Sequence, residues 1–203
     1  QNRMQQDFPA LDDLTAQTVQ CDIQDVDAGL EAYSSPAFYM IPPIDALMQN
    51  TIRINRSSTA DGIELYTTLA HEGYPGHLYQ TVYSSLVCDT QTLPIRKLFS
   101  YGGYVEGWAY YTERISYEYA AQVLAEAEGS LGSSYPAALL CTLLAQQRDL
   151  QINLFCLLDL SLHYYGTEES ELLRSLESFG LSEEQSERVS DYLRTAPAVY
   201  LKY

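Results

Sequence analysis

The amino-acid sequence predicts an α+β fold that is mainly helical and carries a small antiparallel β-sheet. Residues 18–23 and 51–55 alternate in polarity like strands, and residues 37–41 form a short extended run. From Gly62 onward the apolar residues recur at helical spacing instead. A chain of 203 residues, 46% of them apolar, is long enough to bury a sizeable core. We therefore expect a single domain over residues 1–203, with a mixed strand and loop region over 1–60 and a helical region over 61–203.

Prolines, glycines and acidic residues indicate where these elements begin and end. Pro42 and Pro43 follow the second extended run directly, and because proline cannot donate a ladder hydrogen bond, this strand should lie at a sheet edge. Pro136 is suited to the first turn of a helix. Helix-stop and N-cap signals recur at residues 166–169 and 181–184 and predict two short helices near the end. The longer helices are expected over residues 62–71, 78–87, 103–127 and 137–164.

Composition excludes several classes of protein. The chain has 27 Asp+Glu against 11 Lys+Arg, a formal net charge of −16, so its surface repels phosphate backbones and we expect no nucleic-acid partner. No run of 18 apolar residues occurs, which argues against membrane insertion of this segment. The first residues lack the profile of a secretion signal, and we interpret the chain as part of a longer protein.

The strongest chemical signal is the heptapeptide His-Glu-Gly-Tyr-Pro-Gly-His at residues 71–77, which contains two of the three histidines. Paired histidines with an adjacent glutamate are typical of helices that bind zinc, where Glu72 would activate a metal-bound water. The usual spacing is four residues, and an uninterrupted helix at ~100° per residue would separate His71 from His77 by about 240°. Pro75 and Gly76 permit a bulge that brings His77 back beside His71. The alternative is a helix end with one capping and one surface histidine.

Two histidines leave zinc short of ligands, and hydrolytic sites take a third from elsewhere in the chain. Glu106 and Glu113 lie seven residues apart, on one face of a predicted helix that also carries Val105, Trp108 and Ala109. We expect Glu106 to be the third ligand and Glu113 to accept an imidazole N–H. The alternative is that both acids belong to a solvated helix face. The apolar neighbours favour burial, which is costly for an uncompensated carboxylate.

The two segments together resemble a bacterial family known as domain of unknown function 885. Its HE…PGH…Q and EGWA…E signatures match residues 69–80 and 104–113, and further similarity at 38–39, 54–55 and 159–163 extends the resemblance over roughly residues 36–203. The family is similar to the gluzincin metallopeptidases, so the resemblance implies a zincin-like catalytic domain with a Zn²⁺ cofactor. It implies metal ligands His71, His77 and Glu106, and Glu72 as general base. Family chains are longer, so the resemblance covers their C-terminal part.

A peptidase also needs a donor for the oxyanion formed at the substrate carbonyl, and His163 and Tyr203 are the candidates. Asp159 lies four residues before His163 and could orient the ring. The alternative for His163 is a histidine favoured by the dipole at a helix C-terminus. Tyr203 is weakly matched to a family tyrosine, because residues 197–203 depart from the family pattern. The alternative is an ordinary tyrosine, one of 18 in the chain.

These observations predict a zinc-dependent peptidase with a peptide substrate, which the edge strand near Tyr39 could bind by strand addition. One alternative is a catalytically inactive module that binds metal or peptide. Another is a hydrolase of a non-peptide amide or ester, since activated water attacks any accessible carbonyl. Nitrogen and oxygen ligands also suit cobalt or manganese. The sequence leaves the oligomeric state and the compartment open, with bacterial cytoplasm and cell envelope both compatible.

Overall fold

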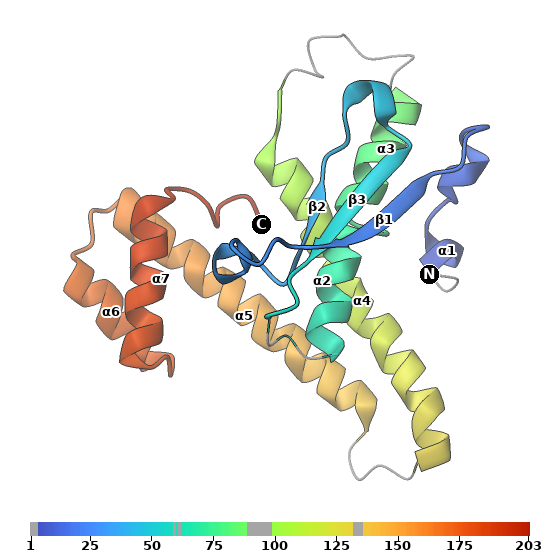
Figure 1. Cartoon of the computed structure of the whole chain (residues 1–203). Helices are drawn as coiled ribbons and strands as arrows, with labels where there is room; N and C mark the ends of the chain where they lie inside the picture. Colours follow the sequence, from blue (N-terminus) through green and yellow to red (C-terminus); the bar gives the residue numbers. More distant parts are fainter. Residues whose placement is uncertain (1–3, 59, 61, 89–98, 132–135) are drawn as a thin grey trace. The chain divides into compact units, whose positions relative to one another are not determined.

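The computed structural model describes residues 4–58, 60, 62–88, 99–131 and 136–203 (Figure 1). The chain divides into two compact units, Gln1–Leu143 and Leu144–Tyr203. The helix α5, Ala137–His163, contributes to both. The single catalytic domain expected over residues 1–203 stays a prediction.

The first unit contains a three-stranded sheet made of β1 (Gln20–Asp25), β2 (Ala37–Met40) and β3 (Gln49–Ile54) in the order β1-β3-β2. β2 lies at an edge, as Pro42 and Pro43 predict. The expectation of an antiparallel sheet is wrong in part, because β1 pairs with β3 in parallel and only β2 is antiparallel to β3. After β1 the chain passes to the far edge and returns through the 3-10 turn η3 (Ile44–Ala46), so β3 enters the sheet between its two predecessors.

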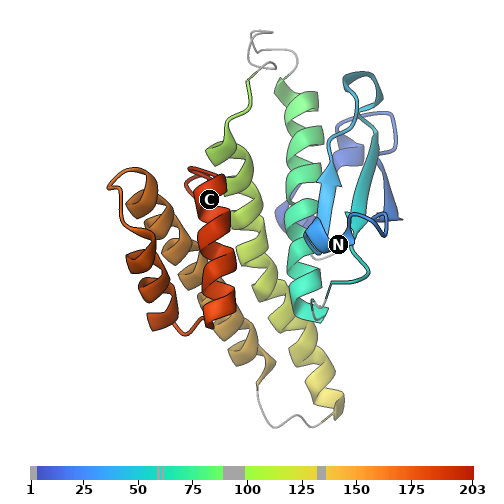
Figure 2. The same cartoon turned by 60° about the vertical axis from the view of Figure 1, so that its left-hand side comes forward.

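Helices pack against this sheet in successive layers. Figure 2 shows α2 (Gly62–Glu72) between the sheet and α4 (Gly102–Leu131), and α2 contacts both β2 and α4. α3 (His77–Cys88) follows α2 and also contacts α4. The face of α4 with Ala109, Thr112 and Ser116 is fully buried, and these small side chains allow the neighbouring helices to approach closely. This packing determines which α4 residues can reach the heptapeptide.

The N-terminal segment completes the core of the first unit. It contains α1 (Met4–Asp7) and the 3-10 helix η1 (Leu11–Asp13). A second 3-10 helix, η2 (Glu31–Tyr33), follows β1 and precedes β2 along the chain. The buried core combines residues from this segment with residues from α2 and α3: Met4, Phe8, Leu11, Ala70, Leu78, Tyr79 and Val82. Trp108 of α4 packs against this cluster. The heptapeptide is therefore supported by apolar packing on the side of the N-terminal segment.

The second unit contains most of α5, from Leu144 onward, together with α6 (Glu169–Ser178) and α7 (Glu183–Thr195). α6 and α7 lie side by side, and Leu172, Leu176 and Leu193 are fully buried in the core of this unit. Ser182 is the N-cap of α7, as the sequence predicts for this turn, and it also forms a capping box with Gln185. Among the described residues, no helix is both long enough and apolar enough to cross a lipid bilayer.

Candidate metal centre

The heptapeptide contains a helix break that brings its two histidines together. α2 ends at Glu72 and α3 begins at His77, so residues 73–76 form a bulge between them. The centroids of the His71 and His77 rings lie 4.8 Å apart, with the ring planes at 85°. The bulge expected from Pro75 and Gly76 is present, and the dispersed histidines of the alternative interpretation are not.

Gly76 is the residue that the bulge requires for steric reasons. A Cβ atom at this position would lie 1.8 Å from the carbonyl oxygen of His71 and 2.5 Å from that of Ala70. Both atoms belong to the backbone of α2 and cannot rotate away. Because the chain folds back this closely on the end of α2, the first turn of α3 starts beside His71, and His77 occupies that turn.

Glu106 reaches both imidazoles from α4. Its Oε2 atom lies 3.5 Å from Nε2 of His71 and 3.4 Å from Nε2 of His77. With zinc–ligand distances of about 2.0–2.2 Å, two ligand atoms on a tetrahedron lie about 3.4 Å apart. Both distances to the Glu106 oxygen therefore match the spacing of zinc ligands. All three side chains are largely buried, with side-chain exposures of 9%, 14% and 17% for His71, His77 and Glu106.

Glu113 holds His71 from its other side. The Nδ1–H group of His71 donates to Oε2 of Glu113 over 2.9 Å, and Glu113 is buried. A carboxylate can only accept, so this bond directs Nε2 of His71 toward Glu106 and His77. Burial alone would lower the pKa of His71, but hydrogen bonds to Glu106 and Glu113 outweigh it and raise the pKa to about 9. In the metal-free protein the neighbouring carboxylates therefore favour the protonated form of His71.

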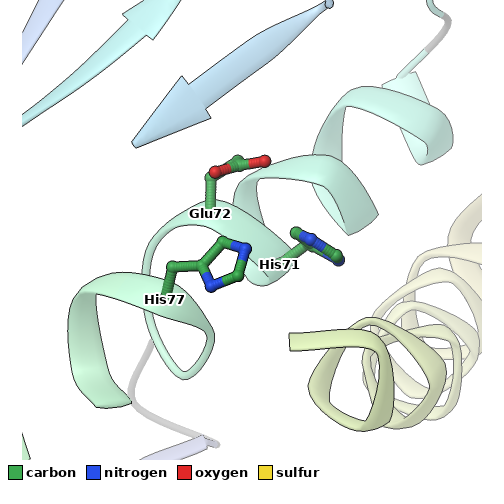
Figure 3. Close-up of side chains that lie close together, drawn as sticks. All are labelled: His71, Glu72 and His77. Carbon is green, nitrogen blue, oxygen red and sulfur yellow. The ribbon is translucent and has the colours of Figure 1, made fainter. Parts of the chain in front are cut away.

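Glu72 lies on the sheet side of the histidine pair (Figure 3). Its Oε2 accepts a hydrogen bond of 2.8 Å from the backbone N–H of Tyr39 in β2. Ligand atoms of His71, Glu72 and His77 all lie within 4.8 Å of one another. Burial raises the pKa of Glu72, with the neighbouring histidines acting in the opposite direction. Glu106 makes the closer contacts with both rings, at 3.5 and 3.4 Å, so it is the better candidate for a third ligand, with Glu72 beside the two histidines.

The donor set suits a divalent transition metal. Two imidazole nitrogens and one carboxylate oxygen are ligands of hydrolytic zinc sites, and cobalt and manganese accept the same set. The residues present thus fit a zinc ion in type, in spacing and in burial. The predicted ligands and the predicted partner of His71 are all brought together within the first unit.

His163 and Tyr203 belong to the second unit, and the expected interaction between His163 and Asp159 is weak. Nε2 of His163 is 3.8 Å from Asp159, beyond hydrogen-bond distance, and instead donates to the backbone oxygen of Leu193 over 2.8 Å. The Tyr203 ring packs 6.2 Å from that of Tyr200. The catalytic roles of His163 and Tyr203 stay predictions.

Several contacts of the site are not predicted by the sequence. The backbone N–H of Tyr39 holds Glu72, but a main-chain donor leaves no signal in the identity of its residue. The indole N–H of Trp108 donates to the carbonyl of Pro75 over 2.8 Å, and the amide of Gln80 donates to the carbonyl of Tyr104 over 3.1 Å. Both side chains lie inside the two motif segments, which is the only signal that could have identified them.

Comparison with known proteins identifies a family and two similar folds. Residues 1–188 match the family described as "Bacterial protein of unknown function (DUF885)". A solved structure of a "putative lipoprotein" from Colwellia psychrerythraea is similar over 100% of this chain, with a TM-score of 0.66 and 22% identity. Another, of a "putative lipoprotein of unknown function" from Shewanella oneidensis, has a TM-score of 0.56 and 21% identity, also over 100% of this chain. This chain spans 34% and 36% of those two proteins. No curated protein matches it.

Proposed function

We propose that this chain, which belongs to the DUF885 family, is a zinc-dependent hydrolase that cleaves peptide bonds. In this proposal His71, His77 and Glu106 hold the metal, and Glu72 is the general base. The proposal extends the gluzincin-like interpretation of the motifs.

The convergence of three buried ligand atoms carries this proposal. Nε2 of His77 and Nε2 of His71 lie 3.4 and 3.5 Å from the same oxygen of Glu106, although α4 is remote from the heptapeptide in sequence. A purely structural ion pair would need only one contact between a histidine nitrogen and the Glu106 oxygen. The nitrogen–oxygen distance in such a pair would also be shorter, as in a strong hydrogen bond. When bound, zinc would supply a Lewis acid that acidifies water and polarises a carbonyl group.

Glu72 has the environment that a general base needs. Burial is the main cause of its raised pKa. The pKa of Glu72 is therefore closer to neutral pH than that of an exposed glutamate, which suits a general base. The N–H of Tyr39 holds one carboxylate oxygen and so limits the orientations of the group. Glu72 could thus take a proton from a water molecule beside the histidines and deliver it to a leaving amine.

The position of β2 favours an extended substrate. This strand is the edge of the sheet on the side away from β1, and the N–H of Tyr39 points from it toward Glu72. A peptide that adds to this edge as a further strand, next to the Tyr39 N–H that Glu72 already occupies, would pass beside the general base. An extended peptide therefore fits the site better than a compact ester or amide, although the chemistry of the centre would serve all three.

Metal analysis of the purified chain tests the ligand set. We expect about one zinc per chain in the wild type and loss of that metal in His77→Ala and Glu106→Ala. Glu118→Ala is the matched control, because Glu118 is an exposed glutamate on the same helix, and it should keep its zinc. Wild-type metal content in both ligand variants would overturn the assignment.

A Glu72→Gln variant separates the enzyme from the inactive module. It should keep the metal and lose hydrolysis of a mixed peptide library followed by mass spectrometry, because the amide cannot accept the proton. Cleavage of a nitrophenyl ester but of no peptide by the wild type would favour the non-peptide hydrolase. A zinc-loaded wild type that cleaves neither substrate would leave only the binding module.

A further inference from the structure

Two hydrogen bonds connect the heptapeptide and α3 with α4 on either side of the candidate ligands. The indole Nε1–H of Trp108 in α4 donates to the carbonyl of Pro75 in the bulge over 2.8 Å. In the opposite direction, Nε2 of Gln80 in α3 donates to the carbonyl of Tyr104 in the first turn of α4 over 3.1 Å. Each segment therefore contributes one donor and one acceptor.

The positions of these bonds relative to the ligands are nearly symmetrical. Tyr104 and Trp108 lie two residues before and two residues after Glu106. Pro75 lies two residues before His77, and Gln80 lies three residues after it. The His77–Glu106 contact of 3.4 Å is thus enclosed between two cross-links that tie the same two segments together.

We infer that Trp108 and Gln80 are positioning residues that hold His77 and Glu106 at metal-binding distance. This inference rests on the proposed function, because the role assigned to the two bonds is to preorganise the metal ligands. The hydrogen bonds of both side chains go to the backbone carbonyls of Pro75 and Tyr104 and not to the ligand atoms, so their effect is transmitted through these carbonyls.

Both donors are themselves held firmly, so the cross-links are stiff. The Trp108 ring is stacked with Tyr79 at 12° and meets Phe8 edge-on at 81°. Gln80 is buried, with 8% of its surface exposed. The backbone groups of Tyr74 and Pro75 make no helical hydrogen bond in the described bulge, so a cross-link to the Pro75 carbonyl restrains a segment that could otherwise shift His77 away from Glu106.

The test is the zinc affinity of variants that remove one donor each. Trp108→Phe keeps an aromatic ring against Phe8 and Tyr79, and Gln80→Met keeps the side-chain length. We expect each variant to bind zinc about 10-fold or more weakly, as for other partners that orient metal sites. We also expect the visible absorption of the cobalt-substituted protein to change, because it reports the coordination geometry.

Tyr74→Phe is the matched control for a lost hydrogen bond in the same bulge. The Tyr74 hydroxyl donates to the carbonyls of Phe8 and Pro9, in the N-terminal segment and not in α4. The Tyr74→Phe variant should lower the melting temperature of the metal-free protein as much as Trp108→Phe does. Its zinc affinity and its cobalt spectrum should stay at the wild-type values.

The outcomes separate this inference from the proposed function. Wild-type zinc affinity and an unchanged cobalt spectrum in both Trp108→Phe and Gln80→Met, with zinc lost in Glu106→Ala, would overturn the inference alone. An equal loss of affinity in Tyr74→Phe would also overturn it, because the effect would then be general destabilisation. A wild type that binds no zinc would overturn both. If Trp108→Phe fails to fold, as judged by circular dichroism, Gln80→Met decides.

Discussion

Each unit contains a histidine beside a buried carboxylate, but the two clusters use their polar atoms differently. In the first unit, Nε2 of His71 and of His77 both face one oxygen of Glu106 at 3.4–3.5 Å, which is too long for strong hydrogen bonds. In the second unit, the two oxygens of Asp159 accept the backbone N–H groups of Ala198 and Tyr200 over 2.9 and 3.1 Å.

This difference separates a cluster whose spacing suits the proposed metal from one that holds the chain together. Asp159 is fully buried and fastens the segment after α7, while His163 donates to the carbonyl of Leu193 at the end of α7. The first cluster has ligand atoms directed at a common point instead. A histidine near an acid is therefore a weak functional signal, and the distances among the atoms are a strong one.

The largest expected effect comes from breaking the geometry of the first cluster with Gly76→Ala. Its Cβ would overlap the His71 carbonyl, so the bulge must rearrange at a cost of about 4 kcal/mol, and the zinc site should be lost with it. Unfolding of the first unit can be followed by the fluorescence of Trp108, the one tryptophan of the chain. Zinc binding of the variant is measured by competition with a chelator.

Gly107→Ala is the control for this substitution. Gly107 lies next to Glu106 in α4, and a Cβ there meets nothing within 4 Å. Because alanine favours a helix, this variant should be more stable by about 0.5–1 kcal/mol and should keep its zinc. A Gly76→Ala protein with wild-type stability and zinc affinity would contradict the steric account of the bulge.

Asp159→Ala should disrupt the second cluster and leave the first intact. Removing the carboxylate leaves the two part-buried N–H groups of Ala198 and Tyr200 without this acceptor, at a combined cost of about 3 kcal/mol. Hydrogen exchange should accelerate at the amides of Ala198 and Tyr200, while the zinc affinity stays unchanged. Asp191→Ala removes an exposed acid from α7 and should change neither quantity. Loss of zinc in Asp159→Ala would show that the two clusters are not independent.

The metal-free first cluster should also make stability depend on pH. The pKa of His71 is about 9 in the folded protein, against about 6.5 for an unfolded histidine. A raised folded pKa contributes stability that is complete below pH 6.5 and is lost as the pH rises through 9. In the presence of a chelator, the free energy of unfolding should fall by roughly 2–3 kcal/mol between these values.

The control for this pH dependence is Glu113→Gln, which removes one of the three carboxylates, Glu106, Glu113 and Glu72, that raise the pKa of His71. The fall in stability between pH 6.5 and 9 should become smaller in this variant, as followed by Trp108 fluorescence during urea unfolding. A pH dependence of equal size in the variant would show that Glu113 does not control the protonation of His71.

The contrast between the clusters also shows which features the sequence could predict. The edge position of β2 follows from Pro42 and Pro43, and the start of α7 follows from Ser182, because these are local effects of single residues. The parallel pairing of β1 with β3 has no such signal, since polarity patterns indicate that a strand exists but not which neighbour it pairs with.

The same distinction holds at the site. The bulge between His71 and His77 was predictable because Pro75 and Gly76 lie between them, and the burial of Glu113 agrees with its apolar neighbours. The bond from Tyr39 to Glu72 and the bonds from Ala198 and Tyr200 to Asp159 all use backbone N–H groups. Such donors are present at almost every residue, so only the fold determines which of them meets a carboxylate.

The smallest expected effect concerns His163. For this residue a structural role and a role in stabilising the oxyanion predict the most different results. His163→Leu removes the donor to the Leu193 carbonyl and should destabilise the second unit by about 1 kcal/mol, with unchanged zinc affinity. His163→Gln can donate to the same carbonyl and should restore part of that loss in urea unfolding followed by circular dichroism. If His163 instead stabilises the oxyanion, His163→Leu would lower kcat for peptide hydrolysis by about 100-fold or more. Because Nε2 is already engaged by a backbone oxygen, we expect the effect on stability and not the one on kcat.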